Sequence, residues 1–287
     1  MTDKKKRVLF TVCAYALFWI VLALMGVAII TGLLASEGTL FNVFVTIAAW
    51  TPTFALLVLF KRLFPESSIK NFFKEAFKQQ LNWGIILSIT VFQVLIFIGV
   101  TGVLAFTKDI SFYNLFDLSL KTIGMGFFWS IIQGAMGEES GWRGFLQSSF
   151  EKNTGVIKSS IIVGLIWGFW HMPLWFMDTE FVGIELVQWI LVFLIAVISC
   201  SIIIGICYKR CRNLFVPIWI HFMFNFLSFL SFIYIGDSLG YITWAAMFYA
   251  VTAIGYIVWY NRLVRLPSQV CCLCSLNISL AMWKMDI

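Results

Sequence analysis

The stretch VLFTVCAYALFWIVLALMGVAIITGLLA, residues 8–35, indicates the fold class because it holds no charged side chain and follows a basic run at residues 4–7. A helix needs about 20 apolar residues to cross the hydrocarbon core of a bilayer, and this run exceeds that length. It is also too long for the apolar part of a cleaved signal peptide. We therefore expect a retained signal-anchor helix that crosses the membrane.

Seven further apolar runs follow, and they extend the same prediction over most of the chain. The candidate spans are 8–35, 39–61, 82–106, 121–148, 155–177, 184–208, 214–235 and 240–261. The 287 residues are 61% hydrophobic and 12% charged, whereas soluble domains are about one quarter charged. The sequence thus predicts an all-α, polytopic transmembrane bundle of about eight spans.

The charged residues between the runs predict the orientation. Lys and Arg gather in the connections 61–78, 152–158, 209–212 and 262–265, and the alternate connections carry Asp and Glu instead. Because basic loops stay on the inner side of a membrane, we expect both termini in the cytosol of a multi-pass protein, in the cell membrane if the source is bacterial. The same bias accounts for the net charge of +6, so no nucleic-acid partner is expected.

Two segments differ from the spans. Residues 62–80 alternate Phe with Lys at helical spacing, which predicts an amphipathic helix on the inner leaflet, with a solvated loop as the alternative. Residues 266–287 form a tail with Cys271, Cys272 and Cys274. An ordinary cytosolic tail is favoured over acylation or a zinc site, and a disulfide framework is not expected.

Three of the apolar runs contain ionisable side chains, which are costly at membrane depth and mark functional sites. The polar positions are Glu138, Glu139 and Arg143 in the fourth run, His171 in the fifth, and His221 with Asn225 in the seventh. Spacing of four residues puts Glu139 with Arg143, and His221 with Asn225, on one helix face each. At about 1.5 Å per residue, the distances to the nearest basic residues put all three segments near mid-membrane, so we expect them to meet.

Each feature also has a structural explanation. A buried Glu–Arg pair, a single histidine or an asparagine can simply join helices. Their coincidence on three separate helices favours a functional site. Gly137-x3-Gly141 and Gly164-x3-Gly168 lie beside these positions and would let the helix backbones approach closely.

The three motifs resemble those of the CPBP family of intramembrane proteases, which includes the CAAX prenyl endopeptidases of the Rce type and the bacterial Abi, or bacteriocin-processing, proteins. The family pattern is Glu-Glu-x3-Arg, Phe-x3-His and His-x3-Asn or Asp. This chain has Glu138-Glu139-x3-Arg143, Trp167-x3-His171 and His221-x3-Asn225, with Trp167 in place of the usual Phe. The resemblance divides the chain into N-terminal spans (1–119), a protease core (120–235), a last span (236–265) and the tail (266–287).

The resemblance implies an endopeptidase that hydrolyses a peptide bond within the bilayer. Glu138 would act as the base, oriented by Glu139 and Arg143, and His171 would hold the water with it. His221 and Asn225 would donate hydrogen bonds to the oxyanion, and Trp167 would pack against this arrangement. The substrate would be a peptide or protein in or at the membrane. A prenylated tail, a bacteriocin leader and a transmembrane peptide fit equally well.

Alternatives use the same residues. In a zinc-dependent version Glu138, His171 and His221 would be ligands, with Glu139 as the base. The cofactor is thus none or a divalent metal, with a preference for direct activation of water. A non-catalytic bacteriocin-immunity protein or membrane scaffold could share the fold. A transporter with a mid-membrane proton site is less favoured, because no inverted repeat or broken-helix pair stands out.

Overall fold

The computed structural model describes residues 1–177, 181–232 and 238–265 of the chain. Within these ranges every regular element is a helix and there is no strand, which confirms the predicted all-α bundle. The longer helices are α1 (Asp3–Ile30), α2 (Thr39–Ala49), α3 (Thr51–Val58), α6 (Trp83–Lys108), α7 (Leu120–Ser130), α10 (Val156–Trp170), α12 (Gly183–Cys211), α13 (Phe215–Phe232) and α14 (Ser238–Arg265). The shorter ones are α4 (Phe60–Leu63), α5 (Ile69–Ala76), α8 (Met136–Glu139), α9 (Ser148–Thr154), α11 (Leu174–Met177) and the 3-10 turn Phe112–Leu115.

Four helices in the described part of the chain are long and apolar enough to cross a membrane: α1, α6, α12 and Leu239–Leu263 of α14. The pair α2 and α3 gives a fifth candidate, whose halves meet at a bend of 52°. Pro52 lies at the start of α3 and explains the bend, because proline lacks the backbone N–H that a continuous helix needs. Helices α10 and α13 are apolar but shorter. Each of the eight predicted runs therefore contains helix, whereas only four or five meet the length of a full span.

The predicted span at 155–177 is wrong at its end. Helix α10 stops at Trp170, and the chain turns at residues 171–173 before the short α11. Pro173 explains the stop, because its ring blocks continuation of the preceding helix. His171 therefore caps α10 and does not lie inside it.

The predicted span at 121–148 is a composite of five consecutive helical pieces. Two π-helical segments, Ile131–Ala135 and Ser140–Gln147, lie on either side of α8. Helix α9 then continues the rod to Thr154. π-Helical turns are rare and are frequently found at functional sites. Both segments here adjoin the carboxylate pair on α8.

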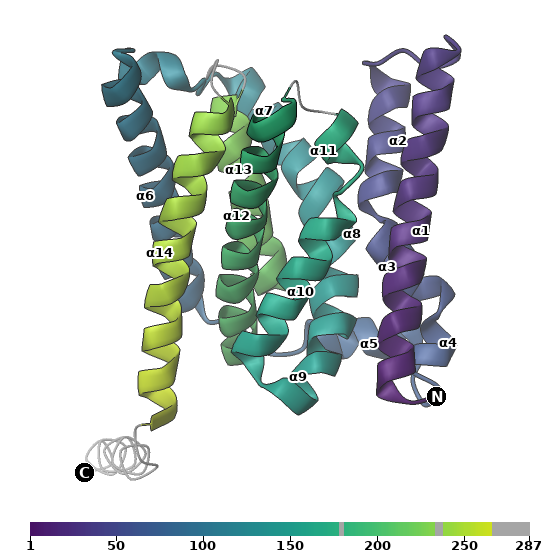
Figure 1. Cartoon of the computed structure of the whole chain (residues 1–287). Coiled ribbons are helices and arrows are strands. Elements are labelled where there is room, and N and C mark those ends of the chain that lie inside the picture. Colours follow the sequence, from purple (N-terminus) through teal and green to yellow (C-terminus); the bar gives the residue numbers. More distant parts are fainter. Residues whose placement is uncertain (178–180, 233–237, 266–287) are drawn as a thin grey trace, which may run out of the picture.

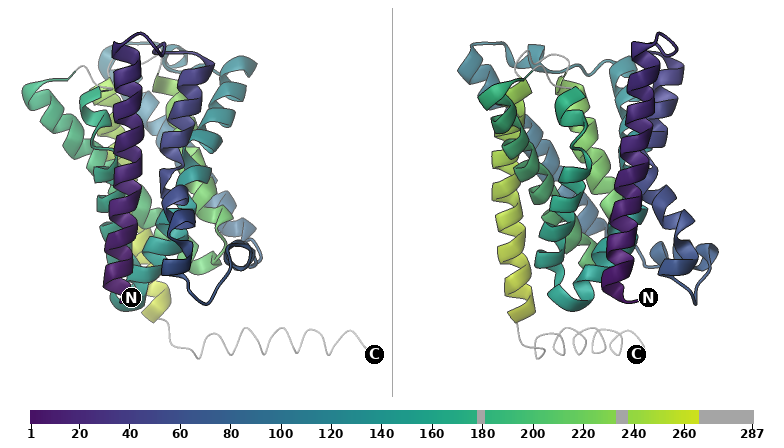
Figure 2. Two further views of the ribbon diagram at one scale, coloured as in Figure 1. Left: turned by 90° about the vertical axis from the view of Figure 1, so that its right-hand side faces the viewer. Right: turned by 45° about the vertical axis from the view of Figure 1, so that its right-hand side comes forward.

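The described part of the bundle has two large apolar cores, which α12 and α10 connect, and a smaller one where α13 packs on the π segment Ile131–Ala135. One large core joins α6, α12, α13 and α14, and the other joins α1, α3 and α10. Helix α12 packs along α14 on one side and along α10 on the other, as Figure 1 shows. In both Figure 1 and Figure 2, the start of α1 and the end of α14 lie at the same end of the bundle, here called the terminal end.

Both predicted glycine pairs lie at helix crossings, which confirms their expected role. A Cβ atom on Gly141 would lie 2.7 Å from the carbonyl oxygen of Pro52 in α3. A Cβ atom on Gly164 would lie 2.9 Å from the Cα atom of Ile198 in α12. Only glycine permits such close approach of the backbones.

The basic connections meet at the terminal end, as the loop pattern predicts. Arg212 bonds Glu151 at 2.7 Å, and the Lys6 ammonium donates to the carbonyl oxygen of Leu63 at 2.6 Å. The amphipathic segment is shorter than predicted, because its helix α5 covers only Ile69–Ala76. The cysteine-containing tail at 266–287 lies outside the described residues, and so does the last part of the predicted protease core, 233–235.

Candidate functional site

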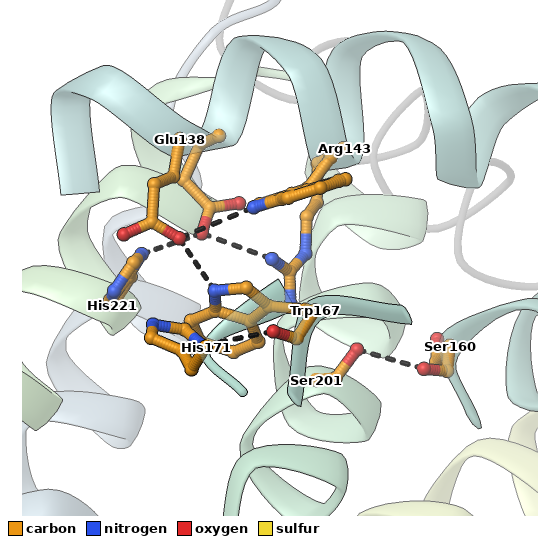
Figure 3. A network of polar contacts seen from close by, with 9 residues as sticks. Glu138, Arg143, Ser160, Trp167, His171, Ser201 and His221 are labelled. Atoms are coloured by element: carbon orange, nitrogen blue, oxygen red, sulfur yellow. Dashed lines mark hydrogen bonds and ion pairs between the residues drawn. The ribbon is translucent and has the colours of Figure 1, made fainter. Parts of the chain in front are cut away.

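Two tryptophans hold one oxygen of the buried Glu138 carboxylate. The indole Nε1 of Trp167 in α10 donates to Oε2 at 2.5 Å, and Nε1 of Trp142 donates to the same oxygen at 3.2 Å. Figure 3 shows the carboxylate pointing from α8 toward the indole of Trp167. Hydrogen bonds to an ionised group are among the stronger ones, so they fix the carboxylate while leaving its second oxygen for another partner. The site's expected base is thus held by donors from two helical segments.

Glu139 forms a buried ionic contact with two other predicted residues. Its Oε1 lies 3.1 Å from Arg143 Nη1 and 2.8 Å from His221 Nδ1. The side chains of Glu139 and Arg143 are fully buried. The guanidinium also lies 4.7 Å from the ring centre of Trp167. The expected Glu139–Arg143 pair is present, and His221 joins it across 82 residues of sequence.

The second histidine lies against Trp167. His171 Nδ1 is 2.9 Å from the carbonyl oxygen of Trp167, so in the neutral ring Nδ1 carries the proton and Nε2 can accept one. The indole of Trp167 makes an edge contact with His221 at 4.8 Å between ring centres and a tilted contact with His171 at 6.0 Å. Trp167 packs against the site as expected, and it also donates a hydrogen bond.

Asn225 lies one helical turn beyond His221, beside the π segment that precedes α8. A Cβ atom on Gly134 would come within 2.5 Å of Asn225 Nδ2 and 3.7 Å of His221 Nε2. The missing side chain at Gly134 therefore makes room for the Asn225 amide. The structure thus gathers Glu138, Glu139, Arg143, Trp167, His171 and His221, and places Asn225 at their edge.

Sequence reasoning missed two contributors, Trp142 and Gln133. Trp142 follows Glu138 by four residues, so the spacing rule used for Glu139 and Arg143 could have found it. Gln133 lines the cavity beside Glu138 and donates to the carbonyl oxygen of Asn42 at 3.1 Å. Nothing in the sequence distinguishes it from any other polar residue in an apolar run.

A cavity of about 410 Å³ connects the site to the surface of the bundle. Glu138 and His171 line its polar side together with Gln133. Its remaining wall is mostly apolar and comes from α1, α2 and the segment around α11, including Phe18, Leu22, Met25, Phe41, Val45 and Leu174. Because Met25 and Ile29 belong to the last turns of α1, the cavity extends from the site away from the terminal end.

The arrangement does not present a ready-made metal site. The described residues hold no group of three or more His, Cys, Asp or Glu side chains placed to bind a metal ion. Nδ1 of each histidine already faces an oxygen atom, and Oε2 of Glu138 accepts two indole N–H groups. The zinc-dependent alternative would therefore require these side chains to rearrange.

Comparison with known proteins identifies the same segment of the chain. Residues 119–227 match the family described as type II CAAX prenyl endopeptidase Rce1-like. A CAAX prenyl protease 2 from Methanococcus maripaludis is 29% identical over 99 residues, which cover 33% of this chain and 36% of that protein. The match thus spans about a third of the length of this relative. The matched residues contain all the predicted site positions from Glu138 to Asn225. Over residues 119–227, these comparisons confirm the predicted resemblance to the CPBP family of CAAX-type intramembrane proteases.

Proposed function

We propose that the chain is an intramembrane endopeptidase in which Glu138 activates the hydrolytic water. The observation that carries this proposal is the position of Glu138 between two indole hydrogen-bond donors and an apolar cavity. One oxygen is held by the indoles of Trp142 and Trp167, and the side chain lines the cavity that also contains His171. A base so placed can contact water and a peptide in the cavity without losing its orientation.

The proposed reaction balances with the groups at hand. Glu138 takes a proton from water while Nε2 of His171 accepts the water's other O–H, and the hydroxide oxygen attacks the carbonyl carbon of the peptide. Nδ2 of Asn225 donates to the resulting oxyanion, and so does Nε2 of His221 when the ring carries both protons. Glu139 lies against Nδ1 of that ring and counters its charge. Glu138 then passes its proton to the leaving amine, and the C–N bond breaks.

The cavity favours an apolar peptide substrate. Its lining is mostly apolar, and most of the apolar side chains come from helices α1 and α2. A prenylated tail, a bacteriocin leader and a transmembrane peptide all carry apolar groups that this wall could bind. The N-terminal spans 1–119 therefore supply most of the substrate-binding wall, whereas 120–235 supplies the chemistry and the part of the wall around α11.

The test uses matched glutamate variants of the full chain. Membrane proteomics of cells with the wild type, Glu138→Gln or Glu37→Gln should reveal new peptide termini in the first and third strains only. Glu37 is exposed and far from the site along the chain, so it controls for the loss of one carboxylate. Each variant must accumulate to the same level. Cleavage retained by purified Glu138→Gln protein would contradict the assignment of Glu138 as the base. No new peptide termini in any strain, the wild type included, would favour the non-catalytic immunity or scaffold role.

A further inference from the structure

Polar side chains continue from the site to the terminal end along one helix face. Glu139, Arg143, Gln147 and Glu151 follow one another at intervals of four residues. The first three are fully buried, and the side chain of Glu151 is 6% exposed. Glu151 pairs with Lys209 at 2.5 Å and Arg212 at 2.7 Å, whose side chains reach solvent. We call these four residues the polar stripe.

Every member of the polar stripe has a buried polar atom without a hydrogen-bond partner among the described residues. These atoms are Glu139 Oε2, Arg143 Nε and Nη2, Gln147 Oε1 and Glu151 Oε2. Unpaired buried polar groups are rare in folded proteins, because each loses its hydration without compensation. Several in a row are typical of groups that share ordered water.

Further polar groups widen this path on the side of α10 and α12. Gln147 Nε2 donates to Ser160 Oγ at 3.1 Å, and Ser201 Oγ donates to the carbonyl oxygen of Ser160 at 2.8 Å. A side chain at Gly205 would collide with Ser160 Oγ and Gln147 Nε2, so this glycine leaves the room that these two polar groups occupy. In Figure 3 the guanidinium of Arg143 lies between Glu138 and the Ser160–Ser201 pair.

A separate cavity approaches the polar stripe from the terminal end. It has a volume of about 370 Å³ and is lined by Gly144, Tyr208, Arg212 and residues of α5. Gly144 directly follows Arg143, so this cavity comes within one helical turn of the stripe. Phe72 of α5 covers this point, since a Cβ atom on Gly144 would lie 2.9 Å from its ring.

We propose that the polar stripe binds a file of water molecules that supplies the hydrolytic site from the terminal end. Its purpose rests on the proposed function, because each peptide bond hydrolysed consumes one water molecule. A peptide in the apolar cavity would block that cavity as a route for water. The polar stripe reaches Glu139 from the opposite direction, so water and peptide would arrive by separate paths.

Two adjacent serines allow a matched test of bound water that does not need proteolysis. Ser159 and Ser160 are both fully buried, and each hydroxyl donates to the carbonyl oxygen of Val156. Only Ser160 contacts Gln147 of the polar stripe. Hydroxyl radicals made by X-ray radiolysis oxidise sulfur atoms next to bound water. In the purified full chain, Ser160→Cys should oxidise about ten-fold faster than Ser159→Cys, because only the former lies beside the water file.

Equal oxidation of the two cysteines in folded protein would overturn the water file. A second measurement follows turnover, where Ser160→Ala and Gln147→Leu should lower kcat about ten-fold with KM unchanged, whereas Ser159→Ala should match the wild type. An unchanged kcat in both stripe variants would also contradict the proposal. If Ser160→Cys oxidises selectively in a chain that cleaves nothing, the water file stands and the proposed protease function fails.

Discussion

Trp167 and Glu138 are 29 residues apart on different helices, and the indole Nε1 of Trp167 lies 2.5 Å from Oε2 of Glu138. The family that the chain resembles usually has phenylalanine at this position, which cannot donate a hydrogen bond. In this chain the tryptophan does more than fill space, because it orients the carboxylate expected to act as the base.

Trp167→Phe tests this role. The ring contacts with both histidines remain possible, but the charge-assisted hydrogen bond is lost, so kcat should fall about ten-fold while KM changes little. Turnover of a membrane-peptide substrate measures it. Trp19→Phe is the control, because Trp19 Nε1 donates to the carbonyl oxygen of Trp170, away from Glu138. An unchanged kcat in Trp167→Phe would show that Trp167 contributes only by packing and that its hydrogen bond does not matter for catalysis.

Arg143→Met should destabilise the protein severely. Removing the guanidinium leaves the buried Glu139 with His221 as its only remaining ionic partner among the described residues. Breaking a buried ion pair in this way costs about 3–5 kcal/mol. Thermal unfolding in detergent measures the loss, and the exposed Arg62→Met serves as the control. Equal melting temperatures for the two variants would show that the pair contributes little to stability.

Alanine at two glycine positions should change the stability of the protein in opposite directions. Gly164→Ala would bring a methyl group 2.9 Å from the Cα atom of Ile198, so the α10–α12 contact must open and the protein lose stability. Gly102→Ala lies in α6, and apart from its chain neighbours and the backbone of its own turns no described atom comes within 4 Å of the added carbon. There, alanine should stabilise the helix by up to about 1 kcal/mol. Unfolding midpoints measured side by side would decide, and a stable Gly164→Ala would contradict the close crossing.

Cysteine labelling tests the orientation that the basic loops predict. A membrane-impermeant thiol reagent applied to intact cells should reach Ser111→Cys, which is exposed at the end of α6 far from the termini. It should miss Lys152→Cys, which is exposed in the last turn of α9 at the terminal end. The unsubstituted chain supplies the background from its own cysteines. The reverse pattern would place the termini outside the cytosol.

Most of the candidate site could be predicted from the sequence, because positions along the chain are enough to estimate which residues lie in each helix and at what depth. Apolar length places the helices, and counting residues from basic loops places Glu138, His171 and His221 at similar depth. The rotation of one helix against another is not contained in such counts. The double hydrogen bond from Trp142 and Trp167 to Glu138 depends on that rotation, and so does the contact of His221 with Glu139.

The π-helical segments are a second feature that the sequence could not predict. They add a residue to a turn where tertiary contacts favour it, and the sequence of Ser140–Gln147 carries no distinct signature of this geometry. The stop at Trp170 was predictable, by contrast, because Pro173 follows it closely. The length of the apolar run instead predicts a helix that continues to residue 177.

The metal content distinguishes the two versions of the chemistry. If Glu138 activates water directly, purified active protein should hold well under one equivalent of zinc, and chelators should leave its rate unchanged once their effect on the substrate is controlled. Metal analysis and turnover on the same sample measure both. Stoichiometric zinc, with activity lost on removal and restored on re-addition, would overturn direct activation and make Glu138, His171 and His221 ligands.

Both histidines would then have to bind through Nε2, because Nδ1 of His171 faces the carbonyl oxygen of Trp167 and Nδ1 of His221 faces Glu139. Trp167→Phe would in that case alter zinc affinity as well as kcat, since it removes one of the two indole hydrogen bonds that hold the Glu138 carboxylate.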